Sequence, residues 1–133
     1  MKKGYKDLLA EAEAEIVTLD VEAAKAKLGA PDVVFVDLRD PREREREGVI
    51  PGAYSCPRGM LEFWIDPESP YAKPVFQEKK NFVFFCAGGW RSALASKTAQ
   101  DMGLEKASHI AGGFSAWKAA GGDVEAAPAK KGG

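Results

Sequence analysis

Apolar residues gather in short blocks along this chain, and the blocks alternate with charged, alanine-rich stretches. Two blocks, residues 33–36 and 82–85, are apolar without interruption, which is typical of strands that are covered on both faces. Shorter blocks at residues 16–19, 54–56 and 107–110 predict further strands. Strands that alternate with helices favour an α/β fold with a mostly parallel central sheet of about five strands, flanked by helices.

Helix-forming residues between these blocks predict the helical segments. They are expected at residues 5–15, 21–28, 41–48, 60–65, 91–102 and 114–119. Asp20 is suited to cap the start of one helix, and Pro41 fits the first turn of another. Gly29 and Gly103 stand where two helices should end, because glycine readily adopts the left-handed backbone that follows a helix.

The chain divides into three parts by composition. Residues 1–15 form a helical extension, residues 16–122 form one domain, and residues 123–133 form a tail of Ala, Pro, Lys and Gly that we expect to be disordered. Within the domain, residues 57–76 form an insertion that joins an apolar patch to a loop interrupted by prolines. A homodimer through the N-terminal helix or through this insertion is compatible with the pattern.

Charge and hydropathy exclude several classes of protein. The chain of 133 residues carries a formal net charge of −1, so it lacks the excess of basic residues on which nucleic-acid binding depends. No apolar run approaches the ~20 residues that span a bilayer, and the start of the chain lacks the apolar core of an export signal. We therefore expect a cytoplasmic protein that binds neither nucleic acid nor membrane.

Cysteine and histidine are scarce. The chain has two cysteines and one histidine, too few for a Cys/His zinc site. Without an export signal, a structural disulfide between Cys56 and Cys86 is not expected. No metal and no organic cofactor is implied, and free thiol chemistry remains the open option.

Cys86 is the strongest candidate for that chemistry. It follows the apolar run 82–85 and precedes two glycines, which lower stability unless the backbone must take unusual angles. Amides at a helix N-terminus favour an anion, and the thiolate is the reactive form of cysteine. Asp37 also ends a strand, so a parallel sheet would bring it to the same edge as Cys86, where ligands bind in such folds. The predicted active-site and substrate-binding loop consists of Cys86 followed by Ala87, Gly88, Gly89, Trp90, Arg91 and Ser92.

The last residues of this loop have side chains whose roles stay open. Arg91 could bind an anionic group, or it could pair with Asp37 or a glutamate and hold the loop. Trp90 fits an apolar rim at the mouth of a pocket, and simple packing fits equally well. Ser92 is placed to cap the following helix and to donate its hydroxyl toward the sulfur.

From residue 16 to residue 122 the sequence resembles the single-domain rhodaneses, a family of sulfurtransferases. Four motifs carry the resemblance in the family's order: residues 36–39 with Glu43, residues 48–53, the strand with residues 86–91, and residues 112–121. One motif alone would be a weak signal, whereas four at family-like spacing are specific. The resemblance implies a rhodanese-like three-layer sandwich, in which helices cover both faces of a mostly parallel sheet.

The same resemblance implies that Cys86 alternates between a thiolate and a persulfide. The thiolate would attack the outer sulfur of a donor such as thiosulfate, sulfite would leave, and the bound sulfur would pass to cyanide, a thiol or a protein acceptor. The loop amides would stabilise the sulfur anion without a general base. Residues 87–89 add no second charge beside the thiol, so a neutral or protein-bound persulfide donor is as compatible as thiosulfate.

Charged residues around the motifs are predicted to support the loop. Asp37, Arg39 and Glu43 would form an ion-pair network beneath it, and Arg58 would add positive charge near the pocket. Val49 stands where the family usually has a histidine. Because family members use that position mainly for structure, we expect the chemistry to survive the change.

Several further residues have both a structural and a functional interpretation. A catalytic Cys-His pair would need His109 within hydrogen-bond reach of the thiol, so we interpret His109 as structural, which disfavours a cysteine protease. Cys56 is interpreted as a packed apolar side chain, although it could resolve the persulfide to a disulfide if it lay close. Trp64 and Tyr71, in the insertion, are expected either to pack or to wall the substrate entrance.

Two other functions remain open. Phosphatases of the tyrosine-phosphatase type, like arsenate reductases, occur on this fold, but those phosphatases use a Cys-x5-Arg loop that fits a tetrahedral phosphate, whereas this chain has Cys-x4-Arg. The shorter loop suits a single sulfur atom. A non-catalytic sulfur carrier or regulatory module is the third class, and the intact nucleophile and loop disfavour it.

Overall fold

A computed structural model describes residues 2–128 and shows five parallel strands and six α-helices within them. The strands are β1 (Val17–Leu19), β2 (Val33–Asp37), β3 (Tyr54–Ser55), β4 (Asn81–Phe85) and β5 (Ala107–Ile110). The helices are α1 (Tyr5–Glu15), α2 (Val21–Lys27), α3 (Pro41–Glu47), α4 (Leu61–Ile65), α5 (Trp90–Asp101) and α6 (Gly113–Ala119), with 3-10 helices η1 (Arg58–Met60) and η2 (Pro74–Gln77). The predicted α/β fold is confirmed. Residue 1 of the predicted extension and residues 129–133 of the predicted tail lie outside the described residues.

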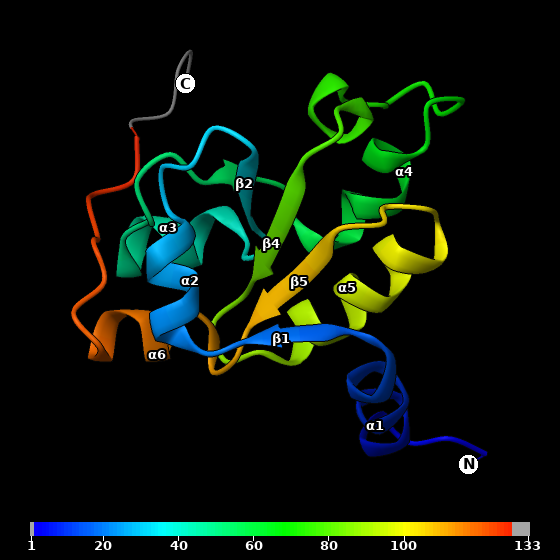
Figure 1. Ribbon diagram of the computed structural model, residues 1–133, viewed down its shortest axis with the longest axis horizontal. Helices are drawn as coiled ribbons and strands as arrows, with labels where there is room; N and C mark the ends of the chain where they lie inside the picture. The colour runs from blue at the N-terminus through cyan, green and yellow to red at the C-terminus, as the bar shows by residue number, and fades with distance from the viewer. Residues whose placement is uncertain (1, 129–133) are drawn as a thin grey trace.

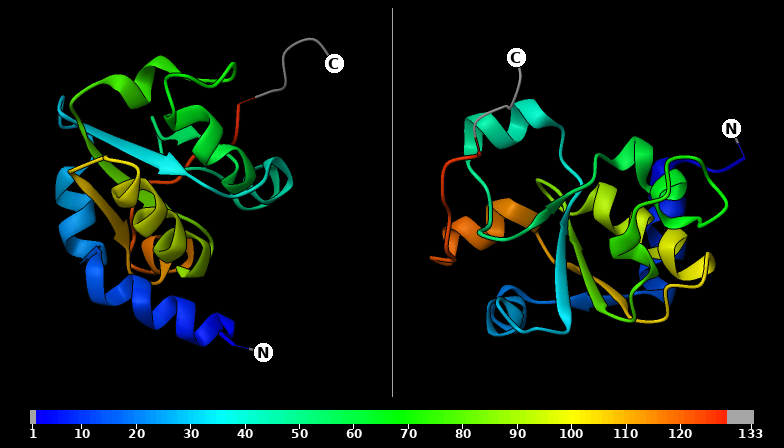
Figure 2. Two further views of the ribbon diagram at one scale, coloured as in Figure 1. Left: turned by 90° about the vertical axis from the view of Figure 1, so that its right-hand side faces the viewer. Right: turned by 90° about the horizontal axis from the view of Figure 1, so that it is seen from above.

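The sheet lies between two layers of helices. Its strand order is β1-β5-β4-β2-β3, so the two uninterrupted apolar runs, β2 and β4, lie inside the sheet. Figure 1 shows α2 and α6 on one side of the strands and α4 and α5 on the other, and the view from above in Figure 2 separates the same two groups. No helix among residues 2–128 is both long enough and apolar enough to cross a bilayer.

Each face of the sheet has its own apolar core, because successive side chains of a strand point to opposite faces. On β4, Phe82 and Phe84 belong to one core, whereas Val83 and Phe85 belong to the other. The first core also contains the buried side chains of α4, η2 and α5, namely Leu61, Ile65, Phe76, Ala95 and Ala99. The second also contains those of α2 and α6, namely Ala24, Phe114 and Trp117. Burial on both faces explains why residues 33–36 and 82–85 of β2 and β4 are apolar without interruption.

The register of the central strands places Asp37 and Cys86 at one edge of the sheet. β2 and β4 pair in parallel with Asp37 opposite Phe85. The ladder extends by one more bond, since the amide of Leu38 donates to the carbonyl of Phe85 at 2.9 Å. The prediction that both strand ends meet at one edge is therefore confirmed.

Side-chain caps define where two helices begin. Asp20 Oδ1 accepts from the amide of Ala23 at 2.8 Å, as its position before α2 predicts. At the start of α3, Asp40 Oδ1 accepts from the amides of Arg42 and Glu43. Glu43 Oε2 accepts in return from the amide of Asp40 at 3.0 Å, which completes a capping box. The box orients the Glu43 carboxylate on the first turn of α3.

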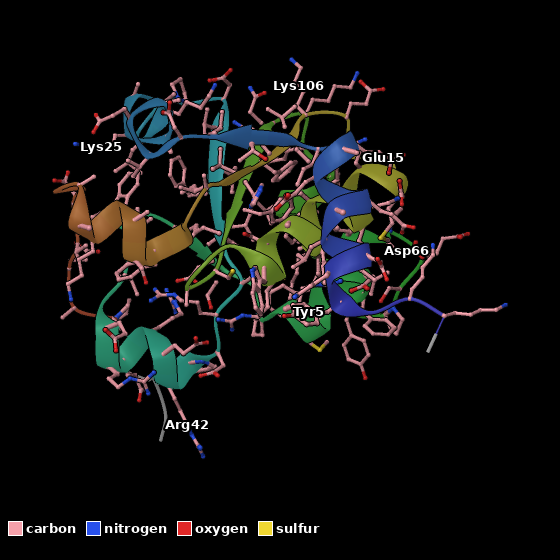
Figure 3. The ribbon with its side chains drawn as sticks, turned by 90° about the horizontal axis from the view of Figure 1, so that it is seen from below. Tyr5, Glu15, Lys25, Arg42, Asp66 and Lys106 are labelled. Atoms are coloured by element: carbon pink, nitrogen blue, oxygen red, sulfur yellow. The ribbon has the colours of Figure 1, made fainter. Side chains whose placement is uncertain are left out.

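The N-terminal helix α1 packs along α5. Lys97 Nζ lies 2.9 Å from Glu15 Oε2, and the ring centroids of Tyr5 and Trp90 lie 5.1 Å apart. Figure 3 labels Tyr5 and Glu15 at opposite ends of α1, which runs beside α5. The extension is thus attached to the helix that follows the predicted active-site loop.

The expectation of a disordered tail at residues 123–133 is wrong for its first residues. The amide of Val49 donates to the carbonyl of Glu125 at 2.8 Å, and the reverse bond is 2.9 Å long. Trp117 Nε1 donates to the carbonyl of Asp123 at 2.9 Å. Composition does not predict these contacts because they use the backbone of the tail, which every residue type provides.

The insertion also differs from its predicted form. η2 is a 3-10 helix where a proline-rich loop alone was expected, and Pro74 occupies its first turn. The segment folds back on α4, since the amide of Lys73 donates to the carbonyl of Trp64 at 2.9 Å and Gln77 Nε2 donates to that of Ile65 at 2.7 Å. Phe76 is 2% exposed and anchors η2 in the core.

Candidate active site

Cys86 follows the last residue of β4 at the carboxyl edge of the sheet, and a tight turn connects it to α5. Gly89 precedes the first residue of α5 and has a φ of +109°, a backbone conformation that side-chain-bearing residues rarely adopt. This turn lets the chain reverse within three residues and brings the N-terminus of the 12-residue helix α5 next to the thiol. Gly89 therefore has a structural cause, whereas Gly88 has neither a positive φ nor a close neighbour at its Cβ position.

The Cys86 sulfur has two polar neighbours within an apolar cluster. The amide of Gly89 donates to Sγ at 3.1 Å, and Sγ lies 3.6 Å from Ser92 Oγ. Cys86 itself is 1% exposed and belongs to the core that includes Leu38 and Leu61. Among residues 2–128, one loop amide donates to this sulfur, and the Cys86 thiol itself donates to Ser92 Oγ, so the donor set is smaller than the predicted cradle of several amides. Both groups can donate to an anionic sulfur, which strengthens such bonds.

The first backbone amides of helix α6 hold the active-site loop in place. The amide of Phe114 donates to the carbonyl of Cys86 at 2.8 Å, and that of Ser115 donates to the carbonyl of Ala87 at 3.1 Å. A Cβ atom on Gly113 would overlap the Cys86 carbonyl oxygen and would lie 2.8 Å from that of Ala87. Gly113 therefore permits the close approach on which these two hydrogen bonds depend.

Arg91 and Glu43 form a two-bond ion pair between α5 and α3. Arg91 Nη1 donates to Glu43 Oε2 and Nη2 donates to Oε1, both at 2.8 Å. The hydrogen bonds from Arg91 lower the pKa of Glu43 to about 2, and the same pair raises the pKa of Arg91. Of the roles left open for Arg91, the structure shows the pairing with a glutamate.

Asp37 forms the centre of a separate ion-pair cluster. Asp37 Oδ2 accepts from Arg39 Nη2 at 2.9 Å and from Arg44 Nε at 3.1 Å. Asp37 and Arg39 are fully buried, and the Arg39 guanidinium carbon lies 4.0 Å from the centroid of the Phe114 ring. The predicted network of Asp37, Arg39 and Glu43 thus divides in two, because Glu43 takes Arg91 as its partner and Arg44 takes the second position on Asp37.

Arg58 and Cys56 follow β3 and lie beside the carboxyl end of β2, where their amides donate to the carbonyls of Leu38 and Asp37, respectively. Arg58 Nη1 donates to Glu62 Oε1 at 2.8 Å, one helical turn further along. Burial raises the pKa of the fully buried Cys56 to about 12, and the charge of Arg58 opposes this rise only in part. That Arg58 adds positive charge near the pocket stays a prediction. Cys56 packs in the core as an apolar residue, which agrees with its interpretation from the sequence.

The aromatic residues proposed around the entrance separate into two groups. Trp90, on the first turn of α5, is 62% exposed and contacts Tyr5. Trp64 packs its ring against that of Tyr54 at a centroid distance of 6.2 Å, and Tyr71 is exposed in the loop after α4. Trp90 is therefore the exposed aromatic side chain that the loop itself provides.

His109 and Ser92 form a contact that the sequence interpretation missed. Ser92 Oγ lies 2.9 Å from His109 Nδ1, and His109 Nε2 lies 3.2 Å from Thr18 Oγ1. His109 is 3% exposed. Inside the protein, the Ser92 hydroxyl lies between the imidazole of His109 and the sulfur of Cys86. Parallel pairing of β5 beside β4 brings His109 opposite Phe84, two residues before the thiol. The sequence feature that could have indicated this contact is the position of a lone histidine on a strand that ends beside the loop.

A groove of about 720 Å³ lies at the opposite end of the sheet from the loop. Its lining includes Phe76, Phe82 and Leu104, which lie near the amino ends of the strands and the end of α5. Cys86 and the six residues after it are absent from this lining. The thiol is therefore a shallow site at a loop, separate from the large groove.

Comparisons with known proteins agree on the family. A family model described as the rhodanese-like domain matches residues 20–120. The chain is 34% identical over 98 residues to the thiosulfate:glutathione sulfurtransferase of Saccharomyces cerevisiae, and the match covers 70% of each chain. It is 30% identical over 98 residues to thiosulfate sulfurtransferase/rhodanese-like domain-containing protein 3 of Mus musculus, over 70% of this chain. The match spans 62% of the length of the mouse relative.

A solved structure from Rhodopseudomonas palustris is similar over nearly the whole chain. That protein is described as one of unknown function and a possible tyrosine phosphatase. The two sequences are 64% identical, the TM-score is 0.91, and the match covers 94% of this chain and 96% of the other.

Proposed function

This chain belongs to the rhodanese-like domain family, and from that premise we propose that it moves a sulfane sulfur through a persulfide on Cys86. The Cys86 thiolate attacks the outer sulfur of a donor, so that a new S–S bond forms while the donor's own bond to that sulfur breaks. The rest of the donor leaves with the bonding electron pair, as sulfite does from thiosulfate. A thiophilic acceptor then attacks the bound sulfur, and Cys86 leaves as a thiolate. The cycle is balanced and needs no oxidant.

The observation that supports this proposal most directly is the pair of polar groups at the sulfur: an amide that donates to it, and a hydroxyl that accepts from the thiol and can donate to an anionic sulfur. The amide of Gly89 at 3.1 Å and the hydroxyl of Ser92 at 3.6 Å face a side chain that is otherwise packed among apolar residues. An inert, buried cysteine needs no such contacts, because its thiol packs as a small apolar group. The donors instead favour a sulfur that is negatively charged in part of its cycle, as a thiolate and a persulfide are.

Anchors on two sides of the loop support the same function. The amide of Phe114 holds the Cys86 carbonyl, and the Arg91–Glu43 pair holds the start of α5. A loop fixed in this way keeps its donors aimed at the sulfur before the reaction begins. Preorganised donors stabilise developing charge without reorganising during the step.

The low exposure of the Cys86 thiol limits the size of the sulfur donor and the sulfur acceptor that can reach it. Because Cys86 is 1% exposed, the reacting atom must be a terminal sulfur on a narrow group. Thiosulfate and low-molecular-mass persulfides satisfy this requirement, as does a persulfide at the end of an extended protein segment. Cyanide, a small thiol or a protein thiol would serve as the acceptor, and the name of the yeast relative makes glutathione a candidate for direct testing.

Phosphatase activity is the second candidate, and the description of the Rhodopseudomonas palustris protein favours testing it. A phosphate bound at the loop would need several donors around its oxygen atoms. In this chain both terminal nitrogens of Arg91 are bonded to Glu43, and the spacing from Cys86 to Arg91 is one residue shorter than in those phosphatases. These two features favour sulfur over phosphate as the group that the loop accepts.

Intact mass spectrometry after incubation with thiosulfate or mercaptopyruvate tests the proposal. The expected result is a gain of one sulfur atom that disappears on addition of cyanide. Cys86→Ser should not gain this sulfur, whereas the matched control Cys56→Ser should gain it as the unchanged protein does. If no donor adds sulfur while an aryl phosphate is turned over by a Cys86-dependent reaction, the function is that of a phosphatase. If neither reaction occurs and Cys86→Ser still binds a sulfur compound normally, the protein is a binding module.

A further inference from the structure

A continuous row of polar side chains connects the buried thiol to the edge of the sheet. It begins at Cys86, passes through Ser92 and His109, and ends at Thr18. The successive distances are 3.6 Å, 2.9 Å and 3.2 Å. The first three members are at most 3% exposed, whereas Thr18 lies on the exposed edge strand β1. Buried polar groups are costly unless they are paired, so this row requires a structural or a functional reason.

The hydroxyl of Ser92 has one proton and three neighbours that can accept it. These neighbours are the carbonyl of Gly89 at 3.2 Å, the sulfur of Cys86, and Nδ1 of His109 when that nitrogen carries no proton. A neutral imidazole has a proton on only one of its two nitrogens. If the proton is on Nδ1, the ring donates to Ser92, and the hydroxyl proton is available to the Gly89 carbonyl, which accepts it while Cys86 is a thiol, and to the sulfur once that is an anion. If the proton is on Nε2, the ring competes with the sulfur for the hydroxyl proton.

We propose that His109 is a positioning residue for the sulfur chemistry: its Nδ1–H donates to Ser92 Oγ and thereby directs the Ser92 hydroxyl proton to the anionic sulfur of Cys86. Thr18 completes the arrangement by donating its hydroxyl to Nε2 of the ring. The role of this row rests on the proposed use of Cys86 as a sulfur carrier. It requires no proton transfer to the imidazole, since the ring stays neutral and only orients a neighbouring hydroxyl.

The surroundings of the ring agree with a neutral histidine. Burial lowers the pKa of His109 from its ordinary value, and the charge of Glu13 on α1 opposes this only in part. The other titratable group that the row brings to the ring is Cys86, which acts through Ser92. A cationic imidazole would donate from both nitrogens and could not accept from Thr18. Each hydroxyl can donate or accept, so both neutral tautomers satisfy the two observed contacts, and the tautomer with its proton on Nδ1 is the one that the proposal requires.

The row also gives the N-terminal part of the chain a connection to the thiol. Thr18 precedes residues 20–120, which the family model matches. It is held beside His109 because β1 pairs in parallel with β5, with Thr18 opposite His109. β1 therefore provides more than an additional strand, since it supplies the hydroxyl that can donate to Nε2 of the ring.

Alkylation of Cys86 by iodoacetamide across a range of pH measures the effect without requiring sulfur transfer. His109→Leu and Ser92→Ala should each slow alkylation near neutral pH by about three- to tenfold, the effect expected for loss of one hydrogen bond to an anion. The double variant should be no slower than Ser92→Ala, because His109 acts only through that hydroxyl. His109→Asn, which retains a donor, should recover part of the rate. Ser96→Ala is the matched control, since Ser96 lies one turn further along α5, is equally buried and has a hydroxyl without a partner among the described residues.

Nuclear magnetic resonance of the unchanged protein tests the proposed tautomer directly. The chain contains one histidine, so its imidazole nitrogens give a single pair of signals. At a pH where Cys86 is ionised, the proton should be found on Nδ1, and Thr18→Val should reduce that preference. A proton on Nε2, or independent and multiplying effects of His109→Leu and Ser92→Ala, would overturn the proposal. Failure of every donor to add sulfur would instead count against the proposed function and leave both of these measurements interpretable.

Discussion

Arg91 and Glu43, 48 positions apart in the sequence, are joined by two hydrogen bonds of 2.8 Å each. The pair connects the first turn of α5, which follows the thiol, to the first turn of α3. A parallel two-bond arrangement fixes orientation as well as distance, which a lysine in place of the arginine could not do. Arg91 therefore holds the loop, and the polar contacts of the sulfur are with the Gly89 amide and the Ser92 hydroxyl.

Replacing Glu43 by glutamine should weaken this anchor. We expect the free energy of unfolding to fall by about 1 kcal/mol near neutral pH, because the pair is only partly buried. The rate of sulfur loading should fall as well, since the start of α5 is held less firmly. Urea unfolding and the mass-spectrometric loading assay measure the two effects. Glu47→Gln on the same helix is the control, because Glu47 pairs with an exposed neighbour, Arg46, and neither quantity should change. Equal effects of the two substitutions would contradict the anchoring role.

The contribution of this pair should depend on pH in a defined window. The pKa of Glu43 is lowered from 4.5 to about 2 by Arg91, so folding favours its ionised form. The stabilisation is complete above about pH 4.5 and is lost as the pH falls from there toward 2. The difference in unfolding free energy between the unchanged protein and Glu43→Gln should therefore shrink steadily over that window. A difference that stays constant down to pH 2 would show that the charge of Glu43 is not responsible.

Gly113→Ala should disturb the fold and the site together. The residue has a φ of +58°, and a Cβ atom there would overlap the Cys86 carbonyl oxygen. We expect a loss of stability above the about 1–3 kcal/mol that an unfavourable backbone conformation costs alone, together with loss of sulfur loading. Gly121→Ala, at the other end of α6, has a φ of +76° and open space around its Cβ position. This control should lose less stability and keep its loading activity, as thermal unfolding and the loading assay would show.

The two thiols should react differently in the native protein. Burial raises the pKa of Cys56 to about 12, so its thiolate is scarce at any pH below that value. Brief treatment with iodoacetamide near neutral pH should therefore modify Cys86 and spare Cys56, as peptide mapping would reveal. After denaturation both residues should react, which confirms that folding is the cause. Preferential modification of Cys56 in the native chain would contradict the assignment of Cys86 as the reactive thiol.

Local sequence patterns were sufficient to predict most of the helices and strands. The unbroken apolar runs of residues 33–36 and 82–85 predicted strands that are covered on both faces, and Asp20 predicted the start of α2. These features depend on a few adjacent residues and on which faces are buried. The position of Cys86 at a strand end next to glycines followed from the same local reasoning, and its role as sulfur carrier stays a prediction.

Contacts between residues that are far apart in the sequence were harder to predict. His109 and Ser92 are 17 positions apart, and Thr18 and His109 are 91 apart, so their contacts depend on the order of strands and on exact register. The second partner of Asp37 was missed for a related reason. The charged run of α3 contains several arginines, and only the helix orientation selects Arg44. Backbone pairing of Glu125 with Val49 leaves no side-chain signal at all.

The position of β5 has a consequence for synthesis of the protein on the ribosome. β1 is an edge strand that pairs with β5. The first strand to be synthesised therefore cannot pair until the last strand has been synthesised. The amides of α6 that hold the Cys86 carbonyl are made later still. When Cys86 has just left the ribosome, the nascent chain therefore lacks the contacts that hold the active-site loop. Transfer of sulfur by an organised loop should accordingly arise only when translation has passed α6.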